Sequence, residues 1–488
     1  MEELLFTNYD KKKIAILKIL NRRIGQHTRI SVLVEELEVS YHGIVALLEE
    51  MQHEMMLLFG LTLCEKGFKV IPFQQPVCES RYFKYLAEQS MAFQFLLTSL
   101  TQPQTTIETF AAQHYVSRST VNRSLKKLKD YLKEKEIQLN ISKIKLSGSE
   151  IDIQLFLVHM LLMIDPKRIE VLFRDFRKEA GIMVCLRQQN LLSNYQHVVL
   201  IIFIIARLRY TQGYRIQEVK GFDAFYPSLD HELNDYLHGF INDEQQFSYH
   251  RHYLKGLIFF LLHYTDRSAH QDGIIDHFSE HIKKEQPLFA QLSDEIAQSL
   301  DTHYAERKAN GKKCYEVERI IFLILYFTFA TNGRPLNFWW LDHVHEVPQR
   351  KQSNLLEKDI RKIINKYARR VGYEWVNIGK ANLPSYLAFF IFPYYQHRRM
   401  EKLRIGLLPT LDFSAIQRLS FFLEHVEFIE FGIANNAENS FDFYLADSEK
   451  ALQSISSTQI IPFHQAKIED MSSLFEVLWE KYLKKNNR

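Results

Sequence analysis

Residues 115–132 read YVSRSTVNRSLKKLKDYL. The apolar residues of this stretch recur at the spacing of one helix face: Val121, Leu125, Leu128 and Leu132. Between Ser117 and Lys129 there are five basic residues and no acidic one: Arg118, Arg123, Lys126, Lys127 and Lys129. The stretch therefore predicts an amphipathic helix whose basic face is either ordinary solvated surface or a surface for phosphates.

The segments on both sides of this helix have the pattern of a winged helix-turn-helix module. TTIETFAAQH (105–114) predicts a preceding helix, and Thr106 and Ser117 offer hydroxyls at the two helix starts. IQLNISKIKLSGSEIDI (137–153) alternates and breaks at Ser147-Gly148-Ser149, which predicts a hairpin wing. The basic helix thus holds the position of a recognition helix in a DNA major groove.

Eleven residues of this module are candidate DNA-binding residues: Ser117, Arg118, Ser119, Thr120, Asn122, Arg123, Lys126, Lys127, Lys129, Lys143 and Lys145. The first turns of the helix would face the groove, where arginine can hold guanine and asparagine can hold adenine by two hydrogen bonds. The lysines further along the helix and in the wing would contact phosphates, which position the protein without specifying sequence.

An earlier segment repeats the plan with the opposite charge. Residues 10–22 predict a helix, residues 28–51 a helix-turn-helix, and residues 57–71 a hairpin around Glu65-Lys66-Gly67. The helix-turn-helix carries mostly acidic charges: Glu35, Glu36, Glu38, Glu49 and Glu50. We expect this first module to contribute little to the affinity for DNA, because its charges repel phosphates.

Composition limits the class of protein. The 488 residues carry a net charge of only +3, so a surface for nucleic acid must be local. Glycine (17) and proline (12) are sparse beside 36 phenylalanines, which favours helices over a turn-rich β fold.

The four cysteines form no CxxC pair, which argues against a zinc site and a disulfide framework. His343 and His345 form an HxH without a clear third ligand, and no phosphate loop or GxSxG elbow occurs. We expect no metal, no cofactor and no enzymatic activity.

The N-terminus does not resemble a secretory signal, and the longest apolar run, residues 198–206, is too short to span a bilayer. We expect a cytoplasmic protein with no membrane segment.

The middle of the chain is helical and repetitive. Residues 195–213 match residues 315–333 at a constant offset, and residues 257–263 match residues 387–393. Two matches in the same order indicate tandem helical domains. The first copy has His197 and His263 at positions where the second has Val317 and Pro393.

The last ninety or so residues change character. Strand patterns occur at residues 402–408, 427–433, 441–446 and 458–463, and helix patterns at residues 413–426 and 468–485. This alternation predicts a small α/β domain with a mainly parallel sheet.

Taken together, these segments resemble the Mga/AtxA-like virulence regulators of Gram-positive bacteria. The resemblance rests on TTIETFAAQHYVSRSTVNRSLKKLK, YQHVVLIIFIIARLRY and FYPSLDHELNDY, and on the order of the segments. It implies a mainly α, multidomain chain with five parts. These are winged helix-turn-helix 1 (1–72), winged helix-turn-helix 2 (73–160), phosphotransferase-regulated (PRD)-like domains 1 (161–285) and 2 (286–397), and an EIIB-like α/β domain (398–488).

The resemblance also implies partners. His197 and His263 match the family's phosphorylatable positions, and the implied donor is the phosphocarrier protein of the sugar phosphotransferase system. From the residues alone, a histidine on an apolar helix is most often packed in a core, so both interpretations stay open. The C-terminal domain lacks the cysteine of an EIIB enzyme and is implied to support a homodimer or a higher oligomer.

The sequence therefore favours a DNA-binding transcriptional regulator, an activator, with double-stranded DNA as its partner. Two alternatives are a phosphotransfer component of the sugar phosphotransferase system and a PRD-type RNA-binding antiterminator. The missing C-terminal cysteine speaks against the first, and two winged modules speak against the second.

Overall fold

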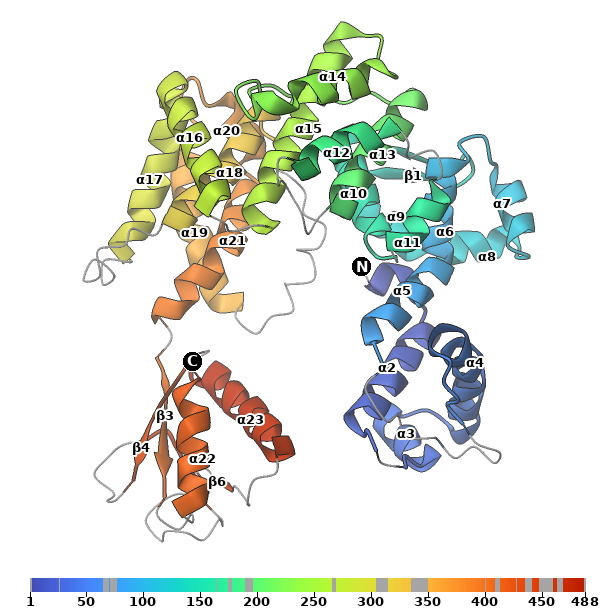
Figure 1. Cartoon of the computed structure of the whole chain (residues 1–488), viewed down its shortest axis with the longest axis vertical. Helices are drawn as coiled ribbons and strands as arrows, with labels where there is room; N and C mark the ends of the chain where they lie inside the picture. The colour runs from blue at the N-terminus through green and yellow to red at the C-terminus, as the bar shows by residue number, and fades with distance from the viewer. Residues whose placement is uncertain are drawn as a thin grey trace. The chain divides into compact units, whose positions relative to one another are not determined.

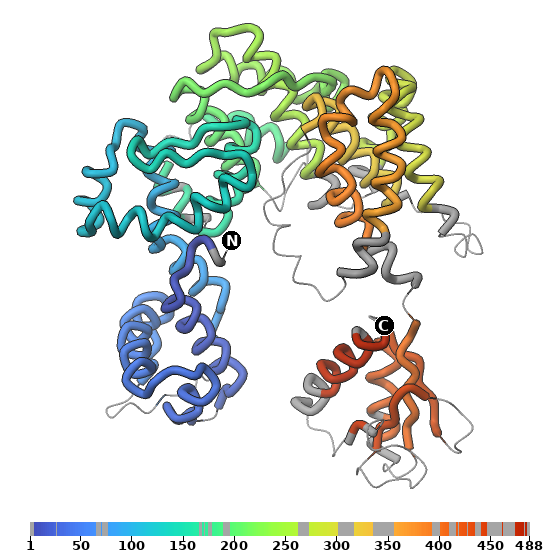
Figure 2. The backbone as a smooth tube through the Cα atoms, turned by 180° about the vertical axis from the view of Figure 1, so that it is seen from behind, coloured from blue at the N-terminus to red at the C-terminus, as the bar shows by residue number. Residues whose placement is uncertain are grey.

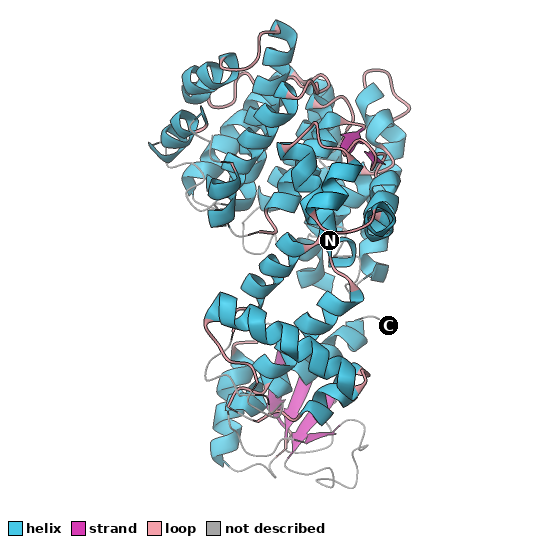
Figure 3. Cartoon of the chain, turned by 90° about the vertical axis from the view of Figure 1, so that its right-hand side faces the viewer, coloured by secondary structure: helices cyan, strands magenta, loops and turns pink. Residues whose placement is uncertain are grey.

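The computed structural model describes residues 2–25, 27–64, 70, 77–164, 166–173, 178–188, 196–265, 269–303, 315–334, 350–399, 401–408, 413–426, 428–434, 441–446, 460–462 and 468–486. These residues are mainly helical, and their strands form one hairpin and one four-stranded sheet (Figure 3). The chain divides into two compact units, residues 1–290 with 325–343 and residues 291–324 with 344–488. The predicted fold class, mainly α and multidomain, is confirmed.

The N-terminal helices are α1 (Glu2–Leu5), α2 (Asn8–Arg22), α3 (Ile30–Leu37) and α4 (Tyr41–Phe59). Thr7 and Asp10 form a capping box that starts α2, and Ser40 caps α4 by accepting a hydrogen bond from the Gly43 amide. The predicted helix and helix-turn-helix are confirmed.

The predicted first hairpin is partly wrong, because residues 57–59 are the last turn of α4. The buried stripe of α4 continues through Met51 and Met55, and Gly60 ends the helix at φ 68°. An antiparallel bridge between Cys64 and Val70 follows, and the predicted turn at Glu65-Lys66-Gly67 lies outside the described residues.

The second module consists of α5 (Glu79–Gln89), α6 (Met91–Thr101), α7 (Ile107–Gln113), α8 (Arg118–Ser124), α9 (Lys126–Glu134), β1 (Gln138–Asn140), β2 (Lys145–Ser147) and α10 (Glu150–Leu161). The strands pair antiparallel with Leu139 opposite Leu146, which confirms the wing.

The position of the predicted turn in the wing is wrong. The chain reverses at residues 141–144, whereas Gly148 lies where β2 passes into α10. A Cβ at Gly148 would lie 2.9 Å from the Glu136 carbonyl oxygen, and the φ of Gly148 is 148°. Glycine is therefore required there by a close backbone approach and not by a hairpin turn.

The first residues of the chain pack with the second module. Leu4, Leu5 and Phe6 are buried, and the Phe6 ring meets Phe83 of α5 edge-on at 4.7 Å. Helix α1 contacts α6 and α9, and both views place the N-terminus beside this module (Figures 1 and 2). The core of the second module thus includes residues from before the first.

Helices continue through α11 (Pro166–Leu172), α12 (Ala180–Gln188), α13 (Gln196–Thr211), η2 (Pro227–Leu229), α14 (Asp230–His238), α15 (Glu244–Thr265), α16 (Ala269–Glu285), α17 (Pro287–His303), α18 (Tyr315–Ala330), α19 (Arg350–Tyr367), α20 (Glu374–Gly379) and α21 (Leu383–Arg399). The matched segments have matched structure, since α13 and α18 are each followed by a glycine in the left-handed region. Gly213 has φ 93° and Gly333 has φ 90°. No helix in the described part of the chain is long and apolar enough to cross a membrane.

Two buried ion pairs hold α13 in place. Arg209 Nη2 and Nε donate to the two carboxylate oxygens of Glu150, the first residue of α10, at 2.7 and 2.9 Å. Arg207 Nε donates to Glu179 at 2.7 Å. Helix α13 also packs along α10 (Figure 1), and α10 directly follows strand β2 of the wing. The ion pairs therefore join α13 to the second module.

The C-terminal residues form β3 (Leu403–Leu407), α22 (Phe413–Glu424), β4 (Ile429–Ile433), β5 (Phe443–Ala446), β6 (Ile460–Pro462) and α23 (Ile468–Asn486). The strand order is β4-β3-β5-β6 and all neighbours are parallel, which confirms the predicted parallel sheet. Leu403, Ile405 and Leu407 of β3 share one core with residues of both α22 and α23.

Candidate nucleic-acid interface

The turn before the basic helix is built as the sequence predicts. Thr106 caps α7 by accepting from the Thr109 amide, and Ser117 caps α8 by accepting from the Thr120 amide at 3.1 Å. Between the helices, Tyr115 adopts φ 55° and its side chain is 97% exposed. This aromatic residue lies beside the start of the basic helix, and no pattern in the sequence indicates its exposure.

The basic helix has one interruption that was not predicted. Helix α8 ends at Ser124 and α9 begins at Lys126, because Leu125 has a ψ of −2°. Backbone hydrogen bonds from Leu125 to Val121 and from Lys129 to Leu125 keep the chain helical across this point. The predicted apolar stripe is confirmed, since all four of its residues are 0% exposed: Val121, Leu125, Leu128 and Leu132.

Most of the predicted DNA-binding side chains are exposed to solvent. Thr120 is half-buried, and the other ten are exposed: Ser117, Arg118, Ser119, Asn122, Arg123, Lys126, Lys127, Lys129, Lys143 and Lys145. The wing lies next to α7, because the Ile107 amide of α7 donates to the Ser142 carbonyl at 3.4 Å. The cations of the wing and those of the helix pair, α8 and α9, therefore lie on the exposed surface of the same module.

Arg118 holds the parts of this surface together. Its guanidinium pairs with Glu108 of α7 at 3.2 Å and lies 3.5 Å from the Ser142 hydroxyl of the wing. The pKa of the Glu108 carboxyl is lowered, first by a backbone hydrogen bond, then by the Thr106 hydroxyl and by the Arg118 charge. An approaching phosphate would compete with Glu108 for Arg118, and this pair could not be predicted because the two residues lie on different helices.

Four of the predicted groove residues, Ser117, Ser119, Thr120 and Asn122, have polar groups engaged within the helix. The Ser117 hydroxyl lies 2.8 Å from the Ser119 hydroxyl and 2.9 Å from the Thr120 hydroxyl, so the three form one capping cluster. The Asn122 amide donates to the Arg118 carbonyl at 3.0 Å. With its side chain held by this bond, Asn122 could read a base only through its Oδ1 and its second Nδ2–H.

Arg123 and Lys127 lie on another side of the helix pair. One turn apart, they line a hollow of about 320 Å³ together with Thr7, Asp10 and Ser90. The hollow lies where the N-terminal segment meets the second module. The cations are therefore spread around the exposed half of the helix pair and do not form a single row.

The first module is less repulsive than its sequence indicates. Buried Lys13 of α2 pairs with Glu50 at 2.7 Å and with Glu54 at 2.8 Å, and Arg23 pairs with Glu36 at 2.8 Å. These pairs neutralise part of the acidic charge. Lys13 and Arg23 lie outside residues 28–51, so the charges of the helix-turn-helix segment alone could not predict these ion pairs.

His197 lies at the start of α13 with its side chain exposed, so the interpretation of a packed core histidine is wrong for this residue. Partial desolvation lowers the pKa of His197, and the nearby charge of Lys84 on α5 lowers it further. The backbone of His263 belongs to α15, and its side chain lies outside the described residues, as do His343 and His345. Among the side chains that the structure describes, no group of three or more residues could hold a metal ion.

Comparison with known families identifies the second module. Residues 79–161, from α5 to the end of α10, match the family model of the Mga helix-turn-helix domain. The matched residues include the basic helix pair and the wing. This match confirms, over these residues, the resemblance that the sequence carries to the Mga/AtxA-like regulators. A search of curated proteins found no match.

Proposed function

We propose that this chain, a transcriptional regulator with an Mga helix-turn-helix domain, activates transcription from duplex DNA that it contacts through α8, α9 and the wing. The observation that carries the proposal is the exposed basic surface of the domain at residues 79–161. The net charge of +3 is too small to attract DNA to the chain as a whole. A local basic surface of this kind would attract the DNA phosphates.

The exposed residues have different roles in this proposal. Lys126 and Lys129 contact phosphates on one side of the helix pair, and Lys143 and Lys145 contact them from the wing. Arg123, on the other side of the helix pair, contacts the bases or the DNA backbone. Tyr115 contacts the DNA backbone with its exposed hydroxyl and ring. Few free base-reading groups remain, so sequence-dependent DNA shape would carry part of the specificity.

Phosphoryl control is the second part of the proposal. The exposed imidazole of His197 is kept neutral by its lowered pKa and can attack a phosphoryl donor, for which the phosphocarrier protein is the candidate. A phosphate there adds nearly two negative charges. It would attract Lys84 of α5, which lies within the DNA-binding domain. His263 is proposed as the second phosphorylated residue.

The remaining parts complete the proposal. Matched α13 and α18 belong to two PRD-like domains, and the parallel-sheet domain serves self-association into a homodimer or a higher oligomer. Its lack of cysteine, with none after Cys314, supports a scaffold and not a thiol phosphotransfer enzyme.

The DNA test uses a pair of exposed lysines. The Lys126→Ala/Lys129→Ala variant of the full chain is titrated with duplex DNA at several salt concentrations. Its control, Lys358→Ala/Lys362→Ala, removes two exposed lysines of α19. Each lost phosphate contact reduces the salt slope by about 0.9, so we expect a reduction of about 1.8 in the first variant and none in the control.

Equal slopes in the variant and in wild type would refute the assignment of α9 to the phosphates. An RNA hairpin of equal length is titrated in parallel. Tighter binding to the hairpin than to the duplex would favour the antiterminator alternative.

The phosphorylation test is labelling by the phosphocarrier protein. We expect His197→Ala to lower labelling and His197→Ala/His263→Ala to abolish it, with His231→Ala, an exposed histidine of α14, as the control. Undiminished labelling of the double variant would refute both assignments.

A further inference from the structure

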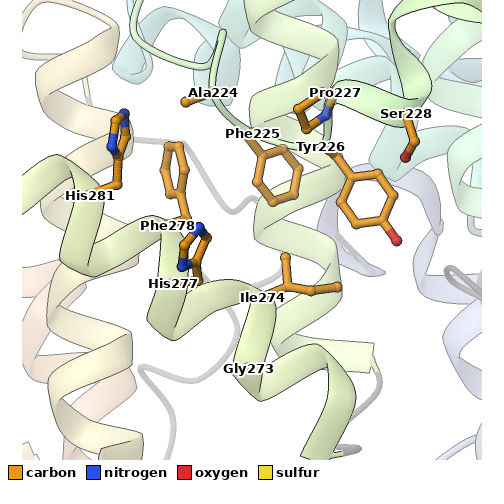
Figure 4. Close-up of a pocket in the computed structure, with 10 residues that line it drawn as sticks. All are labelled: Ala224, Phe225, Tyr226, Pro227, Ser228, Gly273, Ile274, His277, Phe278 and His281. Atoms are coloured by element: carbon orange, nitrogen blue, oxygen red, sulfur yellow. The ribbon is translucent and has the colours of Figure 1, made fainter.

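A hollow of about 700 Å³ lies between α16 and the loop that precedes η2, away from the DNA-binding domain in the sequence. Its apolar walls include Phe225 from the loop and Ile274 and Phe278 from α16. Figure 4 shows Phe225 and Tyr226 extending from the loop toward Ile274 and His277 of the helix. The volume is in the range of sites that bind small molecules.

The loop wall of this hollow is anchored at both ends by α15. At the first end, Arg251 pairs with Asp223 at 3.1 Å, and the Phe222 amide donates to His252 Nδ1 at 3.3 Å. At the other end, Asp230 pairs with Lys255 at 2.5 Å and with Arg251 at 3.1 Å.

The Lys255 side chain is 0% exposed and also donates to the Asp223 carbonyl. Shielded pairs of this kind fix geometry better than surface pairs. The wall is therefore preformed.

Tyr226 stands in this wall in a conformation that only glycine adopts readily. Its φ is 51° and its ψ 66°. Such a backbone is strained in a non-glycine residue and persists where surrounding contacts impose it, often at binding sites. The anchored loop thus holds the Tyr226 ring against the hollow.

The polar groups of the hollow determine the class of ligand. His277 and His281 lie one turn apart on α16, and no carboxylate occurs among the described lining residues. His281 Nε2 lies 3.2 Å from the carboxylate of Glu285, so an anion in the hollow would compete with Glu285 for this nitrogen, whereas His277 forms no such ion pair among the described residues. Imidazole N–H groups donate hydrogen bonds, so they suit an acceptor, and most of all an anion. A metal would need a third ligand, and the described residues offer no such group.

We propose that this hollow binds a small organic anion with an apolar, mainly aromatic body, whose anionic group His277 and His281 hold. The apolar body lies against Tyr226, Pro227 and Ile274, which are the accessible apolar side chains of the lining, with buried Phe225 and Phe278 behind them. The site makes the helical region a receptor for an effector, and it stands independently of the proposed contacts with DNA.

The test compares two fluorescent probes that share one aromatic body. 1-Anilinonaphthalene-8-sulfonate carries an anionic group, and N-phenyl-1-naphthylamine is its neutral counterpart. Gly273→Leu fills the hollow, since Gly273 lines it and a Cβ there meets no atom within 4 Å. Gly181→Leu is the matched control, because Gly181 also lies in a helix with open space but outside the hollow. Ala224→Leu fills the hollow from the loop side.

In wild type we expect one saturable site for the anionic probe. Gly273→Leu and Ala224→Leu should each weaken binding of this probe at least about tenfold, and Gly181→Leu should not change it. The volume-preserving variant His277→Phe/His281→Phe should lose about tenfold for the anionic probe and less than about threefold for the neutral one.

Absence of saturable binding by wild type would overturn the proposal, and so would unchanged binding by both filled variants. Equal losses for the two probes in the histidine variant would overturn the assignment of the anionic group to His277 and His281. Thermal melting of each variant checks its fold, and the two filled variants alter different walls, so misfolding of one leaves the other decisive.

Discussion

Replacing Arg209 by methionine leaves the Glu150 carboxylate buried without the positive charge that it pairs with. The Arg209 and Glu150 side chains are 1% and 5% exposed, and two hydrogen bonds join them. Arg209→Met leaves the Glu150 carboxylate buried with the Gln154 side-chain amide, at 3.1 Å, as its remaining side-chain donor among the described residues. Breaking a buried pair from one side typically costs about 3–5 kcal/mol, because the remaining charge keeps its desolvation cost.

The magnitude depends on which partner is removed. Glu150→Gln leaves a neutral acceptor beside Arg209, and the guanidinium keeps its position over the Tyr214 ring, 3.5 Å from the centroid. The buried guanidinium loses its countercharge but keeps a neutral acceptor and the ring, so we expect this variant to lose about 2–3 kcal/mol, less than Arg209→Met. Glu150→Leu/Arg209→Met removes both charges and should lie within about 1–2 kcal/mol of wild type, since an apolar pair of similar volume often replaces a buried ion pair.

Hydrogen exchange of α10 and α13 is the suitable assay, because a chain of several domains does not unfold in one step. Arg209→Met should accelerate exchange in these two helices by more than a hundredfold, and the double replacement should restore most of the protection. If Arg209→Met changes exchange less than about fivefold, or if the double replacement is as fast as Arg209→Met, an unpaired Glu150 charge is not what destabilises α10 and α13.

Three further predictions concern other parts of the chain. Burial lowers the pKa of His250 from 6.5 to about 4. The unfolded chain binds this proton at a higher pH than the folded one, so His250 should cost about 3 kcal/mol of stability as the pH falls from 6.5 to 4, and His250→Phe should lack this dependence. Alanine changes in residues 40–44 of the first module should weaken DNA binding less than Arg123→Ala, and an equal loss would contradict our ranking. Phe6→Ala should destabilise the second module by about 3–5 kcal/mol in a hydrogen-exchange measurement, and unchanged exchange in α6 and α9 would contradict the packing.

Features with a local cause could be predicted from the sequence. The apolar stripe of the basic helix follows from spacing alone, and the caps at Thr106 and Ser117 follow from the chemistry of their hydroxyls. The parallel sheet follows from the alternation of strand and helix patterns. In each case the deciding residues are neighbours in the chain.

Features that depend on distant residues could not be predicted. The alternating residues 137–146 fit a hairpin reversing at more than one point, and packing of Leu139 opposite Leu146 selects one. The ion pair of Arg118 with Glu108 and those of Lys13 with Glu50 and Glu54 join separate helices. The hollow beside α16 also requires two segments far apart in the chain to meet.

The packing of Leu4, Leu5 and Phe6 with the second module makes the first module an insertion within a single core. A fragment that begins after residue 72 would lack the segment that covers α6 and α9, so apolar side chains there would meet water and favour aggregation. Chimaeras that exchange the first module with a relative's would need to keep residues 2–7 of this chain.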